Sequence, residues 1–304
     1  TPLLPSPSNV PLQPQPGSLS QPQPQSLPPL CSFPPLFPSP NRLTNWRHLC
    51  QLPKFISFSG TVWTQNILSL IFYEGHRNGT EDIVIMDRVP WLEYNVNNLD
   101  LANLSSPRLF FTHLPYYLVP RGLRNRRGKV IYVARNPKDV MVSYFYFSKF
   151  MIALETIPDL NTLMERFLSG KVVYSSWLDH VRGWYTHRED FNILFLTFEE
   201  MKKDLRSAVL KICNFLGKRL SEKELDSVVE QATFENMKRD PRANYEFLPD
   251  TLVEKSKGQF LRKGTVGDWK KIMTVAQSER FDMALKEEMK DLPFNCLWDS
   301  NEEL

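Results

Sequence analysis

A glycine, two hydroxyl side chains and an indole ring stand together in the segment SGTVW. Gly60 lets the backbone approach an anion closely, and Ser59 and Thr61 offer hydroxyl groups. Trp63 offers a ring on which a base can lie. A strand pattern at 55–58 precedes the segment and apolar residues at helical spacing follow it, so free helix N–H groups are expected here. The segment predicts a phosphate site, and an ordinary capped helix start is the alternative.

Two later segments add cations. In RNPKDVMVS, Arg135 follows a strand pattern and Ser143 lies two helical turns further on, so both side chains can reach one phosphate. In RKGTVGDW, Arg262 and Lys263 precede Gly264, and a second glycine follows three residues later, which suits a loop that folds its N–H groups around an anion. A capping and ion-pair cluster is the alternative for the first segment, and a flexible surface loop for the second.

The elements that must position these residues alternate in type. Apolar runs at 55–58, 129–134 and 192–196 predict strands, and the last of them is followed by helical patterns at 205–216 and 221–231. Strands that alternate with helices predict an α/β fold with a parallel sheet flanked by helices on both faces. In such folds ligands bind beyond the carboxyl ends of the strands, which is where the first two segments lie.

Composition divides the chain in two. The first forty residues hold 14 of the 24 prolines, and no charged residue precedes Arg42, so a disordered leader is expected at 1–45 and one folded domain at 46–304. The formal net charge of +3 gives no strong field for a polyanion such as nucleic acid. Four scattered cysteines without metal-ligand spacing favour a reduced compartment, and no apolar run is long enough for a membrane span. The sequence therefore predicts a soluble cytoplasmic protein without a metal site.

The segments SGTVW, RNPKDVMVSYFYF and RKGTVGDWK resemble the cofactor motifs of cytosolic sulfotransferases, from about residue 55 to the C-terminus. SGTVWTQNILSLIFYEGHRNGTE and THLPYYLVP are most similar to the amine sulfotransferase subfamily. The resemblance implies a P-loop-like nucleotide-binding sulfotransferase fold. It also implies transfer of the sulfonate of 3′-phosphoadenosine 5′-phosphosulfate (PAPS), the co-substrate, to a small amine, phenol or alcohol.

The resemblance assigns thirteen residues to the nucleotide. Those expected at the 5′-phosphosulfate are Ser59, Gly60 and Thr61, and Val62 beside them is expected to bind the cofactor. Those expected around adenine are Trp63, Phe198, Thr233 and Phe234. Those expected at the 3′-phosphate are Arg135, Ser143, Arg262, Lys263 and Gly264. Phe198 replaces a family tyrosine, so the ring is kept and the hydroxyl is lost.

His113, in the segment THLP, is the implied general base. An attacking hydroxyl or amine must lose its proton, and an imidazole titrates in the right range for that task. A structural imidazole beside a proline turn is the alternative. A homodimer is also implied, because the family's short dimer pattern recurs at Lys270, Thr274, Val275 and Glu279.

One motif position departs from the family. Phe58 stands where the motif has a lysine, and a phenyl ring cannot stabilise charge that develops on a leaving phosphate. Loss of one such preorganised group typically lowers the rate by about 10²–10³. Lys54 is four residues earlier, about 13 Å along an extended strand, too far for simple replacement. The sequence thus predicts an enzyme with impaired activity, and a nucleotide-binding pseudoenzyme is the alternative.

Overall fold

The computed structural model describes residues 61–73, 82–93, 99–100, 103–104, 106–286 and 288–292, together with the backbone of 54–58. The predicted leader at 1–45 lies outside these residues, so the division into leader and domain stays a prediction. Ser59 and Gly60 also lie outside them.

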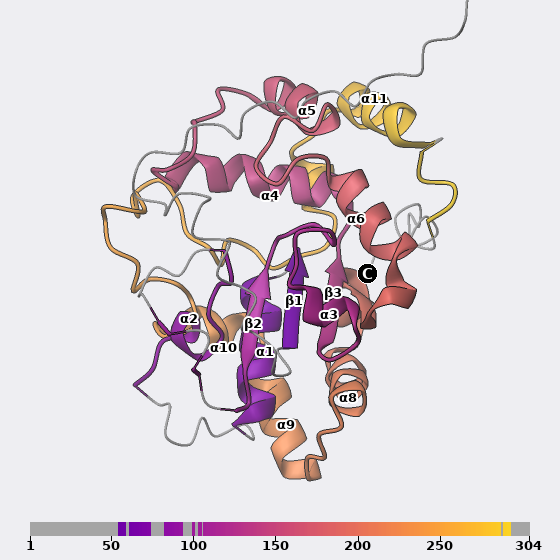
Figure 1. The fold of residues 1–304 in the computed structure, drawn as a ribbon. Helices are drawn as coiled ribbons and strands as arrows, with labels where there is room; N and C mark the ends of the chain where they lie inside the picture. Colours follow the sequence, from indigo (N-terminus) through magenta and orange to yellow (C-terminus); the bar gives the residue numbers. More distant parts are fainter. Residues whose placement is uncertain are drawn as a thin grey trace, which may run out of the picture. The chain divides into compact units, whose positions relative to one another are not determined.

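Four parallel strands form the sheet in the order β2-β1-β3-β4 (Figure 1). Their bounds are Lys54–Phe58 for β1, Leu109–Thr112 for β2, Lys129–Ala134 for β3 and Asn192–Thr197 for β4. The central strand β1 pairs with β2 on one side and with β3 on the other. The parallel α/β fold predicted from the sequence is confirmed, and β2 is the strand that the apolar runs did not reveal.

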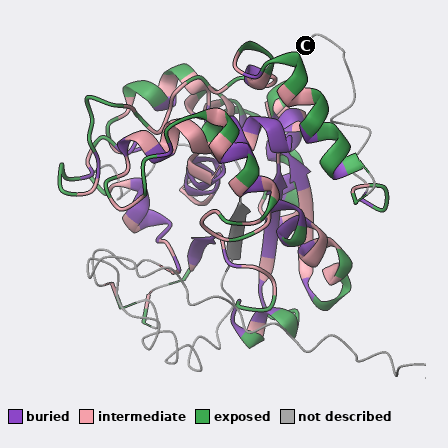
Figure 2. Ribbon diagram, turned by 90° about the horizontal axis from the view of Figure 1, so that it is seen from above, coloured by how far each residue is buried: buried purple, intermediate pink, exposed green. Residues whose placement is uncertain are grey.

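Alternate residues of the strands point to opposite faces of the sheet, as the period of a strand requires. In β3, Val130 and Tyr132 join one apolar cluster, whereas Ile131 and Val133 join another. Both faces are therefore buried around β3, and β2 and β3 are almost wholly buried, whereas the outer sides of the helices are green in Figure 2. A buried two-sided sheet explains why these runs are continuously apolar rather than alternating.

Helices cover each face. Those on the face of Tyr132 are α4 (Pro137–Phe150), α5 (Leu160–Leu168), α6 (Trp177–Thr186) and α11 (Val275–Lys286). Those on the other face are α1 (Thr61–Phe72), α7 (Phe198–Lys203), α8 (Leu205–Leu216) and α9 (Glu222–Gln231). The shorter elements are α2 (Ile85–Arg88), α3 (Arg121–Arg124), η2 (Arg188–Asp190), α10 (Phe234–Arg239) and η3 (Asp268–Lys271).

Local sequence fixes several helix ends. The Asn136 side chain accepts hydrogen bonds from the backbone N–H groups of Lys138 and Asp139, and Pro137 takes the first helical position of α4. Ser221 caps α9, so the helix predicted for 221–231 begins one residue later. Gly217 ends α8 in the left-handed region at φ +72°. Among the described residues, no helix is both long and apolar enough to cross a membrane.

Candidate functional site

The carboxyl ends of all four strands carry predicted site residues. His113 follows β2 directly, Arg135 follows β3 and Phe198 follows β4. Thr61 begins α1, three residues after β1 ends. Because the strands are parallel, these positions lie at one edge of the sheet, where open α/β sheets bind their ligands.

The imidazole of His113 is largely buried, with 16% of its side chain exposed. Its Nε2 lies 3.1 Å from Thr61 Oγ1, so the predicted base meets the start of α1. The ring of Tyr174 stacks on His113 with 5.0 Å between centroids. Burial, and to a smaller extent the nearby His180, lower the pKa of His113 to about 3. A neutral imidazole is the form that can take up a proton.

Arg135 lies between a ring and a backbone carbonyl. Its guanidinium stands 4.3 Å from the centre of the Phe198 ring and donates to the carbonyl oxygen of Thr265 at 3.1 Å. It also forms an ion pair with Asp139, 3.6 Å away. Burial lowers the pKa of Arg135, whereas the Asp139 and Glu199 carboxylates raise it. A cation held in this way faces the segment that carries Arg262.

Asp139 attaches the loop at 262–269 to α4. Its buried carboxylate accepts the backbone N–H of Gly267 at 2.8 Å and that of Trp269 at 3.0 Å. Gly267 has φ +74°, a conformation that glycine adopts without strain. The GDW part of the RKGTVGDW motif is therefore fixed to the first turn of α4, and Arg135, just before that helix, pairs with the same Asp139.

Both cations of the loop contact one carboxylate. Arg262 and Lys263 each donate to Asp268 at 2.6 Å. Burial raises the pKa of Asp268, but the hydrogen bonds from Lys263 and Arg262 outweigh it and the pKa is lowered. A phosphate at this loop must therefore share Arg262 and Lys263 with Asp268.

Ser143 lies on the side of α4 that faces this loop. Asp139, Ser143 and Tyr146 recur at helical spacing, and the residues on either side of Ser143 in this stripe both contact the loop. Asp139 binds the backbone of Gly267, and Arg262 stands 4.3 Å from the centre of the Tyr146 ring. Ser143 itself is exposed, so its hydroxyl is accessible beside Arg262.

Of the residues expected around adenine, Trp63 contacts Phe198 and the chain just before Thr233, and Phe234 contacts the loop at Gly264. The rings of Trp63 and Phe198 form an edge-to-face pair with 5.3 Å between centroids. The indole N–H of Trp63 donates to the carbonyl of Ala232 at 2.7 Å, and Thr233 follows as the N-cap of α10. Phe234 lies against Gly264, where a Cβ atom would stand 2.3 Å from its ring. Gly264 thus allows a contact that any other residue would block.

Val62 follows Thr61 in the first turn of α1. Its side chain packs against the apolar cluster that contains Phe150. The sequence left open whether the aromatic residues of α4 line a pocket or fill the core. Phe150 is fully part of this cluster, 4% exposed, whereas Phe147 is half-buried at its edge.

Thus the described candidates fall into two connected groups, one around His113 and Thr61 and one around the loop at 262–269. Several residues that contact these groups are not among the site residues predicted above: Glu93, Tyr174, His180, Asp139 and Asp268. Only the two aspartates stand inside a recognised motif, so a search for carboxylates near the cations would have found them. Glu93 and His180 come from segments without any such pattern.

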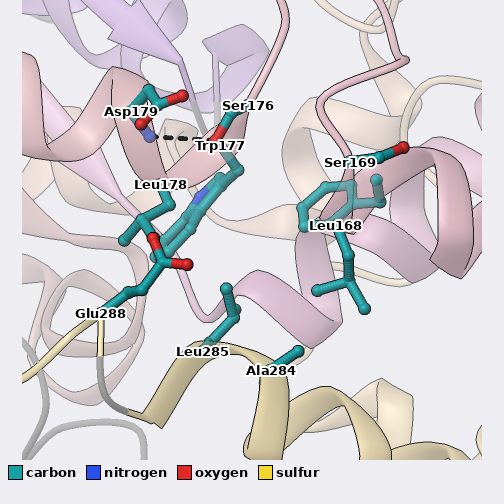
Figure 3. A pocket seen from close by; sticks show the side chains of 10 residues that line it. Leu168, Ser169, Ser176, Trp177, Leu178, Asp179, Ala284, Leu285 and Glu288 are labelled. Carbon is teal, nitrogen blue, oxygen red and sulfur yellow. Dashed lines mark hydrogen bonds between the residues drawn. The ribbon is translucent and has the colours of Figure 1, made fainter. Parts of the chain in front are cut away.

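A separate pocket of about 250 Å³ opens between α5, α6 and α11 (Figure 3). Trp177 and Leu178 from α6 face Leu168 from the end of α5 and Leu285 from α11. Its lining contains none of the predicted site residues, so it is distinct from the site at the strand ends.

The fold is that of an open parallel α/β protein with a cation-bearing loop and a buried histidine at the carboxyl edge of its sheet. The sulfotransferase domain family matches residues 56–293. An amine sulfotransferase from Oryctolagus cuniculus is 59% identical over 81% of this chain and 82% of its own length. Human sulfotransferase 2A1 is 42% identical over 77% and 82%. The mouse sulfotransferase SULT7A1, solved in complex with PAP, aligns with a TM-score of 0.69 at 27% identity, covering 86% of this chain and 93% of that one.

The chain belongs to the sulfotransferase family. The expected resemblance to its amine sulfotransferase subfamily is confirmed by the rabbit relative. A sulfonate-transferring enzyme is the class of activity that these relatives support.

Proposed function

We propose that the chain transfers the sulfonate of PAPS to a small amine, phenol or alcohol. The observation that carries the proposal is that His113 and the start of α1 lie at the same sheet edge as three cations, Arg135, Arg262 and Lys263. The rabbit amine sulfotransferase favours an amine as acceptor. The mouse structure that contains PAP favours a 3′-phosphorylated nucleotide.

The donor set suits such a nucleotide. Guanidinium and ammonium groups recognise phosphate through charge-assisted hydrogen bonds, and Arg135, Arg262 and Lys263 converge around Thr265 and Asp268. Trp63, Phe198 and Phe234 supply aromatic rings on the adjoining side. We assign the cations and Ser143 to the 3′-phosphate, the rings and Thr233 to adenine, and Thr61 with Ser59 and Gly60 to the 5′ side.

PAPS supplies the sulfonate, and the chain supplies the proton acceptor. Burial keeps His113 neutral, so its Nε2 atom can take up the proton that the hydroxyl or amine group of the substrate loses. Thr61, 3.1 Å from Nε2, fixes that nitrogen toward the start of α1. The N–H groups at this helix start would stabilise negative charge as it accumulates on the leaving phosphate.

Two measurements test the proposal. Calorimetric titration should show tighter binding of 3′-phosphoadenosine 5′-phosphate (PAP) than of AMP, because only the former uses the cations of the loop. A sulfonation assay on panels of amines and phenols should then show turnover. Equal affinities for PAP and AMP would refute the nucleotide assignment. PAP binding without turnover would show that the chain binds the nucleotide but does not catalyse transfer.

The alternative function is that of a nucleotide-binding pseudoenzyme, and Phe58 in place of the motif lysine is the sequence observation that favours it. The side chain of Phe58 lies outside the described residues. The substitution Phe58→Lys restores the family residue and should raise kcat by about 10²-fold, with a smaller change in PAP affinity, if the missing cation limits the rate. An unchanged kcat would show that another group supplies the charge, and Lys54 would be the first one to replace.

We also propose that the chain forms a homodimer through Lys270, Thr274, Val275 and Glu279, in the cytoplasm. Val275 begins α11 with 75% of its surface exposed, which suits a contact between copies. The segment is short, so the dimer should dissociate on dilution. Sedimentation that shows only monomer at high concentration, in the parent and in Val275→Glu alike, would refute this.

A further inference from the structure

Two buried titratable side chains hold the backbone of His113 from opposite sides. Its N–H donates to Glu93 Oε1 at 2.5 Å, and its carbonyl oxygen lies 3.1 Å from His180 Nε2. Only 7% of the Glu93 side chain is exposed, and His180 is 3% exposed. The residue proposed to accept the substrate proton is therefore fixed by groups that can themselves change charge.

Backbone pairing places Glu93 beside His113. The residues after α2 run parallel to β2, with Phe111 accepting from the N–H of Leu92 and donating to Pro90. Two residues on from this bridge, Glu93 stands next to His113. The backbone pairing with β2 therefore places the Glu93 residue beside His113.

On the other side, His180 has a defined tautomer. A carbonyl oxygen can only accept a hydrogen bond, so His180 Nε2 must carry the proton that it donates to His113. His180 Nδ1 is then an acceptor and receives the hydroxyl of Tyr132, 3.0 Å away. Burial lowers the pKa of His180 to about 4, so it is a neutral support at physiological pH.

Unlike His180, Glu93 faces the ring of His113 as well as its backbone. Glu93 Oε1 lies 3.9 Å from Nδ1, while Nε2 faces Thr61 on the far side of the ring. Burial raises the pKa of Glu93 to about 7, although hydrogen bonds from His113 and Thr112 oppose the shift. The titratable groups around the His113 ring are thus Glu93, His180 and Tyr174.

We propose that Glu93 is a positioning residue for His113, which it orients with Nδ1 protonated and whose imidazolium its carboxylate stabilises. This inference rests on the proposed function. As the acceptor atom bonds to sulfur, its O–H or N–H proton passes to His113 Nε2, and the S–O bond to the leaving phosphate breaks with its electron pair. The positive charge on the buried imidazole is then offset by the carboxylate beside Nδ1.

Glu93→Gln tests the proposal, because an amide oxygen can still accept the His113 N–H while the charge is lost. In the parent, kcat should rise with pH through an apparent pKa near 7, as the Glu93–His113 pair loses a proton. In Glu93→Gln this rise should be absent, and kcat at pH 8 should fall at least about tenfold, with the PAP Kd within about twofold. An unchanged rise and an unchanged kcat in Glu93→Gln would overturn the proposal.

Glu199→Gln is the matched control. Glu199 is also a buried carboxylate with a raised pKa, and it accepts the backbone N–H of Asn136 at 3.0 Å. Its substitution should leave the rise near pH 7 in place. Loss of that rise in Glu199→Gln as well would show that any buried carboxylate near the sheet edge produces it, which would also overturn the proposal.

A second readout needs no turnover. The ¹⁵N shifts of the His113 ring should change near pH 7 in the parent as Glu93 ionises, and should stay flat in Glu93→Gln. A flat parent titration would overturn the inference even if the enzyme were inactive. His113→Ala separates the two levels: full turnover in that variant refutes the proposed base itself, whereas turnover lost in His113→Ala but normal in Glu93→Gln refutes only the role of Glu93.

Discussion

Around the loop at 262–269, cations and carboxylates face one another at hydrogen-bond distance, whereas around His113 burial keeps the titratable groups neutral. Arg262 and Lys263 both contact Asp268. His113, by contrast, has its pKa lowered to about 3 and Glu93 has its pKa raised to about 7. Burial disfavours the charged form of either type of group, which explains the opposite shifts.

The difference suits the two tasks that we propose for one sheet edge. Binding a phosphate requires permanently charged side chains, and within the fold the carboxylate of Asp268 pairs with these cations. Accepting a proton requires a group that is neutral beforehand and charged afterwards, so it is placed where water is excluded. Substitutions in the first region should therefore alter affinity, and substitutions in the second should alter rate and pH dependence.

The largest effect is expected from His113→Ala. Loss of the proton acceptor should lower kcat by about 10²–10⁴. The PAP Kd should change less than kcat, because the cations assigned to the 3′-phosphate are left intact, although the contact of Thr61 with His113 is lost. Steady-state kinetics with calorimetry on the same preparation measures both quantities. A large loss of PAP affinity with normal kcat would show that His113 acts in binding and not in proton transfer.

The second effect concerns stability and pH. The pKa of Glu93 is raised from 4.5 to about 7, so between these values the folded protein holds a proton that the unfolded chain has released. The resulting stabilisation is complete below about pH 4.5 and is lost as pH rises through about 7. Glu93→Gln removes this dependence.

The free energy of unfolding of Glu93→Gln, relative to the parent, should therefore rise by about 3 kcal/mol from pH 4.5 to 7. His113 and His180 act in the opposite direction, but they are present in both proteins and cancel in the difference. Urea denaturation across this pH range measures it. Two parallel curves would show that Glu93 titrates normally.

Arg262→Ala is expected to have a smaller effect, confined to binding. A hydrogen bond to a charged group contributes about 1.5–3 kcal/mol, so PAP should bind about ten- to a hundredfold more weakly, while AMP changes little. Arg280→Ala is the control, since Arg280 pairs with Glu165 away from the loop. Equal weakening of PAP and AMP by Arg262→Ala would contradict the assignment to the 3′-phosphate.

The smallest effect is expected from Gly264→Ala, which brings a Cβ to 2.3 Å from Phe234 and adds strain at φ +63°. The unfolding free energy should fall by about 1–3 kcal/mol, and PAP should bind more weakly. Gly217→Ala has a similar φ of +72° but no atom within 4 Å of the added Cβ. Its loss of stability should be smaller, and its PAP affinity unchanged. Equal losses of unfolding free energy in the two variants would show that backbone strain at positive φ is the whole cause and that contact with Phe234 contributes nothing.

The sequence predicted the elements whose pattern is local. The apolar run at 129–134 and the helix at 205–216 agree with β3 and α8, because burial on two faces or one face leaves a clear period. The strand β2 has only four residues, LFFT, between a proline turn and the HLP segment. Too few residues stand there for a period to be recognised, although His113 depends on this strand for its position.

The candidate site could be predicted where a motif is continuous along the chain. Asp268 and Gly264 stand within one loop, so their association follows from the sequence. Glu93 reaches His113 through pairing of the residues after α2 with β2, and His180 reaches it from α6. These contacts depend on tertiary packing, which no local pattern of residues records.

The strand order has a consequence for synthesis of the chain. The central strand comes first, and its partners follow far behind: Lys54 pairs with Leu109, 55 residues later, and with Lys129, 75 residues later. On the ribosome, β1 must wait for both neighbours, with its two edges unsatisfied for several seconds at about 5–20 residues per second. The loop that carries Arg262 is made later still and docks on Asp139, 128 residues upstream of Gly267. The sheet can therefore form on the nascent chain before the loop at 262–269 exists, and the proposed nucleotide site is completed only when that loop docks.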